Sequence, residues 1–79
     1  MAVTLRLPRI SMNMVEATIV RWHVTPGDRF KKGDILCEIE TEKVTIDYEA
    51  EGEGEMLEIL AESGAEIEVG SPICRVRPL

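Results

Sequence analysis

The chain has 79 residues, of which 44% are hydrophobic, and it carries a formal net charge of −6. That length allows one small domain, residues 1–79, with a thin core and little room for a deep catalytic pocket. The acidic charge argues against binding to nucleic acids or to anionic membranes, because both need a basic protein face.

Apolar residues recur at every second position along five segments, a period that predicts half-buried strands with one face in water. The residues expected to point inward, in chain order, are Val3, Leu5 and Leu7; Val20, Trp22 and Val24; Ile35, Cys37 and Ile39; Val44, Ile46 and Tyr48; and Leu57, Ile59 and Ala61. Turn-forming residues separate the segments at positions 25–28, 32–34, 51–54, 63–64 and 69–72. No segment keeps an apolar 3.6-residue period for three turns, so we expect no helix.

The chain also repeats itself when its second half is laid over its first. The aligned pairs are Gly27 with Gly64, Gly33 with Gly70, and Cys37 with Cys74, and the apolar positions between them coincide. Two copies are too few for a solenoid, so the repeat predicts one domain with a pseudo-twofold axis. Together with the short strands it predicts an all-β fold, a flattened barrel or sandwich of two small antiparallel sheets.

The two cysteines, Cys37 and Cys74, lie in alternating apolar segments and lack metal-type spacing. Two buried free thiols are the favoured interpretation, and a disulfide between paired segments is the alternative. The sequence has no charged start followed by a long apolar run, and no stretch long enough to span a bilayer. With Met1 as the natural start, the expected location is cytoplasmic.

One lysine stands out at the expected turn between two of the strands. Inward positions run 35, 37, 39 and resume at 44, 46, 48, so a tight turn is expected between them, with Lys43 at or beside its tip. Lys43 is the only base among nine acids from Glu38 to Glu58. Composition alone favours a solvated hairpin-tip residue that relieves like-charge repulsion. The alternative is a modification site, because an amine at the apex of a rigid hairpin is accessible to an attaching enzyme.

Several motifs then carry a family resemblance over nearly all of the chain. They are Leu7-Pro8, the stretch 14–20 with Glu16 and Ala17, Trp22 with Pro26-Gly27-Asp28, Lys32-Gly33-Asp34, the stretch 38–44, and the turns at Gly64 and Gly70. On these residues the chain resembles the lipoyl domain of the dihydrolipoyl acyltransferase component of 2-oxoacid or acetoin dehydrogenase complexes. The resemblance implies a barrel-sandwich hybrid fold and a swinging-arm acyl carrier, with lipoic acid in amide linkage on Lys43.

The resemblance also implies roles for the neighbours of Lys43. Flanking recognition residues are Glu40, Thr41, Glu42 and Val44, and a partner-recognition loop beside the hairpin contains Arg9, Ile10, Ser11, Met12, Asn13 and Met14. One of the two methionines is expected to plug the end of the core and the other to be exposed. The chain departs from the common family pattern with Val44 for alanine, Glu42 for aspartate and Ser11 for glycine. Of these, the departure at Ser11 in the loop bears on partner identity and not on the attachment site.

By the same resemblance the domain is a carrier with no catalytic residues of its own. Its partners would be a lipoate–protein ligase or octanoyltransferase, a thiamine-diphosphate-dependent decarboxylase, an acyltransferase catalytic domain and dihydrolipoyl dehydrogenase. The dithiolane would do the chemistry and the protein would position it. We expect the domain itself to be monomeric, with no metal, nucleic-acid or membrane partner.

Other functions remain open from the residues themselves. A biotin carrier has the same fold but flanks its lysine with methionines, where this chain has Glu42 and Val44. A glycine-cleavage-type carrier would need extra helical segments, and an unmodified partner-binding module needs no cofactor at all. An enzyme is least favoured, because His23 is the only histidine and is expected on a wet strand face, without a nucleophile–base pair or ligand cluster.

Overall fold

The computed structural model describes residues 1–79 and contains eight strands and no helix. The strands are β1 (Val3–Arg6), β2 (Glu16–Trp22), β3 (Arg29–Phe30), β4 (Ile35–Glu40), β5 (Thr45–Glu49), β6 (Gly54–Ile59), β7 (Glu66–Glu68) and β8 (Pro72–Pro78). The all-β prediction is therefore confirmed. The chain has no helix with the length and apolarity that crossing a membrane requires.

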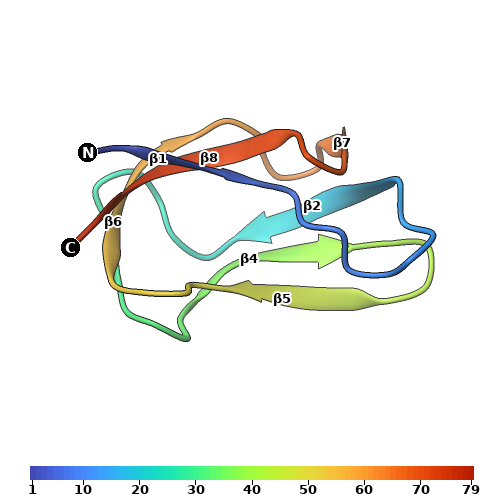
Figure 1. Ribbon diagram of the computed structural model, residues 1–79, viewed down its shortest axis with the longest axis horizontal. Helices are drawn as coiled ribbons and strands as arrows, with labels where there is room; N and C mark the ends of the chain where they lie inside the picture. Colours follow the sequence, from blue (N-terminus) through green and yellow to red (C-terminus); the bar gives the residue numbers. More distant parts are fainter.

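The strands form two four-stranded antiparallel sheets that pack as a sandwich (Figure 1). One sheet has the order β1-β8-β6-β3 and the other β5-β4-β2-β7. The molecule is elongated, with extents of 33 × 20 × 19 Å. In Figure 1 both chain ends lie at the left of the long axis, whereas the β4–β5 hairpin and the β1–β2 loop turn at the right.

The sequence repeat is a structural repeat. The repeat relates β2 to β6, β3 to β7, β4 to β8 and β5 to β1. When each strand is replaced by its equivalent, the order of one sheet becomes the order of the other. The backbone hydrogen bonds follow the same exchange: Gly27 donates to the carbonyl of Met56, and Gly64 donates to the carbonyl of Ile19. All four glycines aligned by the repeat have positive φ, between 90° and 97°, a conformation that residues with a Cβ rarely adopt. The predicted pseudo-twofold symmetry is confirmed.

The core lies between the sheets and is entirely apolar. Its fifteen buried residues are Leu7, Met14, Ala17, Ile19, Val24, Phe30, Leu36, Cys37, Ile39, Ala50, Met56, Ala61, Ile73, Cys74 and Val76. Both cysteines are free and buried, as the favoured interpretation predicted. Trp22 packs against this core, as expected, and its indole N–H donates to the carbonyl of Ala61 at 2.7 Å.

Several residues face differently from the sequence prediction. Val3 was predicted to point inward but is 40% exposed on the edge strand β1, and register shifts explain most of the other differences. Val20 was predicted to point inward but is 40% exposed, because the β2–β4 register shifts between Ile19 and Arg21. A bulge of this kind inserts one residue and reverses the faces that follow it. The inward positions of β2 therefore run from Ala17 and Ile19 before the bulge to Trp22 after it.

Leu36 was predicted to face water but is buried, because the β4–β5 register shifts between Ile35 and Cys37. Val44 was predicted to point inward but is 51% exposed, because β5 begins only at Thr45 and Val44 belongs to the turn. On β6 the sequence predicted Leu57 to point inward, but a register shift between Met56 and Glu58 buries Met56 instead.

Candidate functional site

Lys43 lies in the short loop of the β4–β5 hairpin, immediately beyond the last paired residues, Glu40 and Thr45. This hairpin closes the end of the sandwich opposite both termini (Figure 1). The Lys43 side chain is exposed, and its amine takes part in none of the four ion pairs of the structure. Its amine is therefore free to approach another molecule without first breaking a contact within the domain.

The turn that carries Lys43 is held by the side chain of Thr41. The Thr41 N–H donates to the carbonyl of Val44 at 2.8 Å. The backbone N–H groups of Lys43 and Val44 both donate to the Thr41 hydroxyl oxygen, at 3.2 and 3.1 Å. That hydroxyl in turn donates to the carbonyl of Val44 at 3.2 Å. Sequence reasoning had grouped Thr41 with the flanking recognition residues, without this role in the turn.

A cleft of about 320 Å³ separates the hairpin tip from the loop between β1 and β2. Its lining residues are Ser11, Asn13, Met14, Val15, Glu16, Ala17, Thr18, Glu40, Thr41, Glu42, Lys43 and Glu66. The β1–β2 loop thus lies beside the hairpin, as the resemblance implied. The structure brings Ser11, Asn13 and Met14 to this cleft, whereas Arg9, Ile10 and Met12 do not line it.

The loop takes its shape from Arg9 and Met14. The Arg9 guanidinium donates to the carbonyls of Met12 and Met14, at 3.3 and 2.8 Å. Met14 is buried and also accepts a hydrogen bond from the Ile10 N–H at its sulfur. Met12 is 88% exposed. Met14 is therefore the methionine that plugs the end of the core, and Met12 is available to a partner.

Charge is divided unequally between the two sheets. The strands of the sheet that carries Lys43 hold seven carboxylates and one arginine, whereas the strands of the other sheet hold four arginines and two carboxylates. Around the cleft, Glu16, Glu40, Glu42 and Glu66 accompany Lys43 as the only cation. Lys43 is thus a single positive group at the end of an acidic face.

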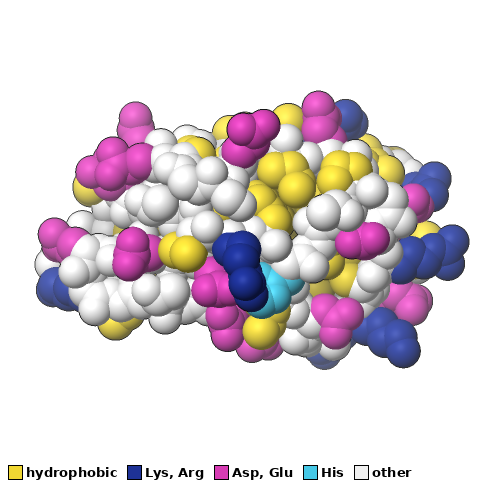
Figure 2. All heavy atoms as spheres, turned by 180° about the vertical axis from the view of Figure 1, so that it is seen from behind, with side chains coloured by type: hydrophobic (Ala, Val, Ile, Leu, Met, Phe, Trp, Pro, Cys, Tyr) yellow, Lys and Arg dark blue, Asp and Glu magenta, His cyan; other side chains and the backbone are white.

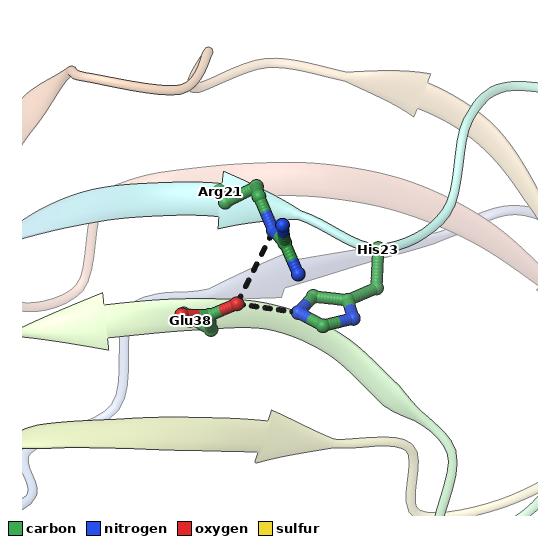
Figure 3. Close-up of polar contacts among 3 residues, drawn as sticks. All are labelled: Arg21, His23 and Glu38. Atoms are coloured by element: carbon green, nitrogen blue, oxygen red, sulfur yellow. Dashed lines mark hydrogen bonds and ion pairs between the residues drawn. The ribbon is translucent and has the colours of Figure 1, made fainter.

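His23 belongs to a small ion cluster on the outside of this sheet (Figure 3). Its Nε2 lies 2.6 Å from a carboxylate oxygen of Glu38, and the Nε of Arg21 lies 3.3 Å from the same oxygen. The hydrogen bond from His23 is the main cause that lowers the pKa of Glu38, and the charge of Arg21 adds to it.

This cluster joins β2 to β4 on a face over which acidic side chains are spread (Figure 2, with the histidine near the middle). His23 is a surface residue, as predicted, although the sequence did not reveal its partners. No hydrogen bond or ion pair joins it to a nucleophile or to the hairpin tip. No group of three His, Cys, Asp or Glu side chains is placed to hold a metal ion.

Known proteins resemble this chain in sequence and in structure. A family model described as "biotin-requiring enzyme" matches residues 3–76. The pyruvate dehydrogenase complex protein X component of Chaetomium thermophilum is 41% identical over 71 residues, which is 89% of this chain and 16% of that protein. The dihydrolipoyllysine-residue acetyltransferase component of the pyruvate dehydrogenase complex of Zymomonas mobilis is 40% identical over 74 residues, which is 92% of this chain and 17% of that protein.

Among solved structures, the lipoyl domain of the 2-oxoglutarate dehydrogenase complex from Azotobacter vinelandii matches with a TM-score of 0.79 at 26% identity. The match covers 94% of each chain. In contrast, the chain spans less than a fifth of the length of the Chaetomium and Zymomonas relatives. The similarity therefore concerns one carrier-sized unit of those longer proteins.

Proposed function

The chain belongs to the biotin- and lipoyl-attachment family, as a lipoyl-type carrier domain rather than an enzyme, and we propose that lipoic acid is attached to Lys43. The observation that carries the proposal is the free amine of Lys43 at the tip of a two-stranded hairpin, opposite both termini. A group attached there stands clear of the sandwich and can enter a partner's active site.

The surroundings of Lys43 fit an amide-linked arm. Its amine has no partner carboxylate to lose when acylation removes its positive charge. The backbone of the turn is fixed by Thr41, so the base of the arm is held while the rest is free to swing. Fixing the base keeps the arm within reach of neighbouring active sites at a high effective concentration.

Attachment is an acyl transfer to Nζ of Lys43. The amine, after losing its proton to the attaching enzyme or to water, attacks the carbonyl carbon of an acyl adenylate made from lipoate and ATP. The new C–N bond forms as the C–O bond to AMP breaks, and AMP leaves. Once attached, the group supplies a dithiolane that accepts an acyl group together with two electrons.

The partners follow from this proposal. They are a ligase or octanoyltransferase for attachment, a thiamine-diphosphate-dependent decarboxylase, an acyltransferase catalytic domain and dihydrolipoyl dehydrogenase. The relatives are components of the pyruvate dehydrogenase complex, which supports partners of this kind. The acidic sheet that carries Lys43 favours basic surfaces on them. We keep the cytoplasm as the proposed location.

Lipoate is the proposed cofactor rather than biotin because of the residues on either side of Lys43. Biotin carriers of the same fold have methionine on both sides of the lysine, whereas this chain has Glu42 and Val44. Both side chains are exposed, so an attaching enzyme meets them directly. The lipoyl domain from Azotobacter vinelandii, similar over 94% of the chain, supports the same choice.

A competition experiment tests the cofactor. Wild-type protein is offered lipoate, biotin, ATP and both ligases, and its intact mass and streptavidin blot are recorded. We expect a gain of one lipoyl group and no biotin signal. The double variant Glu42→Met/Val44→Met keeps the fold, because both positions are exposed, and should gain some biotin. Strong biotin labelling of the wild type would overturn the proposal.

A further inference from the structure

We propose that Thr41 is a positioning residue whose hydroxyl holds the turn in the shape that an attaching enzyme needs at Lys43. This inference rests on the proposed function and deepens it, because it names the group that makes the lysine a substrate. Thr41 does not touch the reacting atoms. It acts through the backbone of Lys43 and Val44, to which it is hydrogen-bonded.

The hydroxyl replaces a hydrogen bond that the strand ladder lacks at this point. The backbone pairing of β4 with β5 ends at Glu40 and Thr45. One further backbone bond joins the Thr41 N–H to the carbonyl of Val44. The reciprocal donor, the Val44 N–H, has the Thr41 hydroxyl as its acceptor. The last rung of the hairpin therefore depends on a side chain.

Every hydrogen-bonding position of this hydroxyl is used. A threonine hydroxyl can donate once and accept twice. Here it accepts from Lys43 and Val44 at 3.2 and 3.1 Å and donates to the carbonyl of Val44 at 3.2 Å. The Lys43 N–H is thereby paired in a loop that is otherwise exposed to water.

No side chain other than that of Thr41 holds the turn. Two-residue hairpin loops usually take type I′ or II′ turns, which need glycine or asparagine at positive φ. This loop contains Glu42 and Lys43, and no residue other than glycine has positive φ anywhere in the chain. The side chains of Glu40, Glu42 and Lys43 make no hydrogen bond and no ion pair. Besides the backbone bond between Thr41 and Val44, the Thr41 hydroxyl alone holds the tip.

The position of the Lys43 backbone matters for attachment. Nζ must reach the acyl carbonyl carbon along the line of attack, and small errors of placement slow such steps greatly. A loose turn spreads the amine over many positions, of which few are productive. Removing the Thr41 hydroxyl should therefore reduce the rate of attachment while leaving the lysine, its charge and its flanking side chains in place.

The experiment compares three variants with wild type in a reaction of lipoate, ATP and limiting lipoate–protein ligase, followed by intact mass. Thr41→Val removes the hydroxyl with little change in shape, and Thr41→Ser keeps it. Thr45→Val is the matched control, because Thr45 is exposed and its side chain makes no hydrogen bond. We expect the initial rate to fall by about tenfold in Thr41→Val and to stay within about twofold of wild type in the other two.

Amide hydrogen exchange, followed by NMR on the unmodified proteins, separates positioning from direct recognition. The Lys43 and Val44 amides should exchange faster in Thr41→Val than in wild type, Thr41→Ser or Thr45→Val. Equal labelling rates for wild type and Thr41→Val would overturn the role of Thr41. So would slow labelling with unchanged exchange, since the enzyme would then be reading the hydroxyl itself. A wild type that gains no lipoyl group would instead overturn the proposed function.

Discussion

Cys37 on β4 and Cys74 on β8 occupy equivalent positions in the two halves of the molecule, and neither side chain has any solvent exposure. Burial is the largest cause that raises the pKa of each thiol, to about 12. For Cys37 the proximity of Cys74 and the negative charge of Glu38 raise the pKa further. Because thiolates attack disulfides and thiols do not, burial keeps both sulfurs from exchanging with an external disulfide.

The native protein should therefore resist thiol reagents. With a pKa of about 12, only about one thiol in ten thousand is ionised at pH 8, and the sulfurs are also inaccessible. We expect no labelling by a disulfide reagent at pH 8 within the time that labels a small thiol. In denaturant both cysteines should react. Rapid labelling of either cysteine in the folded protein would contradict this burial.

Gly54 should not tolerate a methyl group. It pairs with Phe30, and a Cβ built on Gly54 would lie 2.7 Å from Cζ of that ring and 3.0 Å from the carbonyl oxygen of Arg77. Gly54→Ala should lower the free energy of unfolding by roughly 1–3 kcal/mol. Gly52→Ala is the control, because nothing lies within 4 Å of its added Cβ. Urea unfolding of both variants measures the difference.

The repeat itself supplies a rescue for that variant. In the other half of the molecule the equivalent pair is Ala17 and Ile67. There alanine replaces the glycine, and the smaller isoleucine replaces the phenylalanine. Gly54→Ala combined with Phe30→Ile should accordingly recover part of the stability lost by Gly54→Ala alone. If the double variant loses more free energy of unfolding than the two single variants lose together, contact with the ring is not the cause.

Glu38 should stabilise the protein near neutral pH, and this contribution should be lost in acid. Its folded-state pKa is held below the ordinary value of 4.5, first by the hydrogen bond from His23 and then by Arg21. A lowered carboxyl pKa stabilises the fold above the unfolded-state pKa, and that contribution is lost as pH falls through the folded-state pKa. We expect Glu38→Gln to be less stable than wild type at pH 6, and the difference to shrink as pH falls below the ordinary carboxyl pKa of 4.5. Urea unfolding across this range measures both curves, and parallel curves would contradict the coupling.

Deleting Glu42 should greatly reduce attachment even though a lysine remains. The deletion removes one of the residues between Thr41 and Val44, so the Thr41 hydroxyl bonds cannot persist in their present form. A changed loop length in a tight hairpin also shifts the strand register and moves side chains to the other face. Glu42→Ala keeps the loop length and the Thr41 hydroxyl bonds, so it should be labelled much faster than the deletion variant. Normal labelling of a folded deletion variant would contradict the importance of the turn.

Five of the eight strands, β1, β2, β4, β5 and β6, could be predicted because alternation is a property of the sequence alone. The position of Lys43 followed in the same way, from the change of parity between the strands on either side of it. The strands β3, β7 and β8 were not among the predicted segments. The bulges at Ile19 and at Ile35 could not be predicted, since an inserted residue depends on how the sheets twist together. They account for the wrong faces assigned to Val20 and Leu36.

Contacts made by individual side chains also could not be predicted from the sequence. The bonds of the Thr41 hydroxyl depend on one rotamer within one turn shape. The hydrogen bonds from Arg9 to the carbonyls of Met12 and Met14 require a loop conformation that the hydrophobic periodicity of the sequence does not describe. The pairing of His23 with Glu38 joins neighbouring strands whose register had to be known first.

The most direct test of Lys43 as the attachment site is peptide mapping by mass spectrometry after reaction with lipoate, ATP and a lipoate–protein ligase. Wild type should gain one lipoyl group, located on Lys43, and Lys43→Arg should gain none. The control is Lys31→Arg/Lys32→Arg, which removes the only two other lysines and should be labelled as wild type. A lipoyl group found on Lys31 or Lys32, or a Lys43→Arg variant that is still labelled, would contradict the assignment.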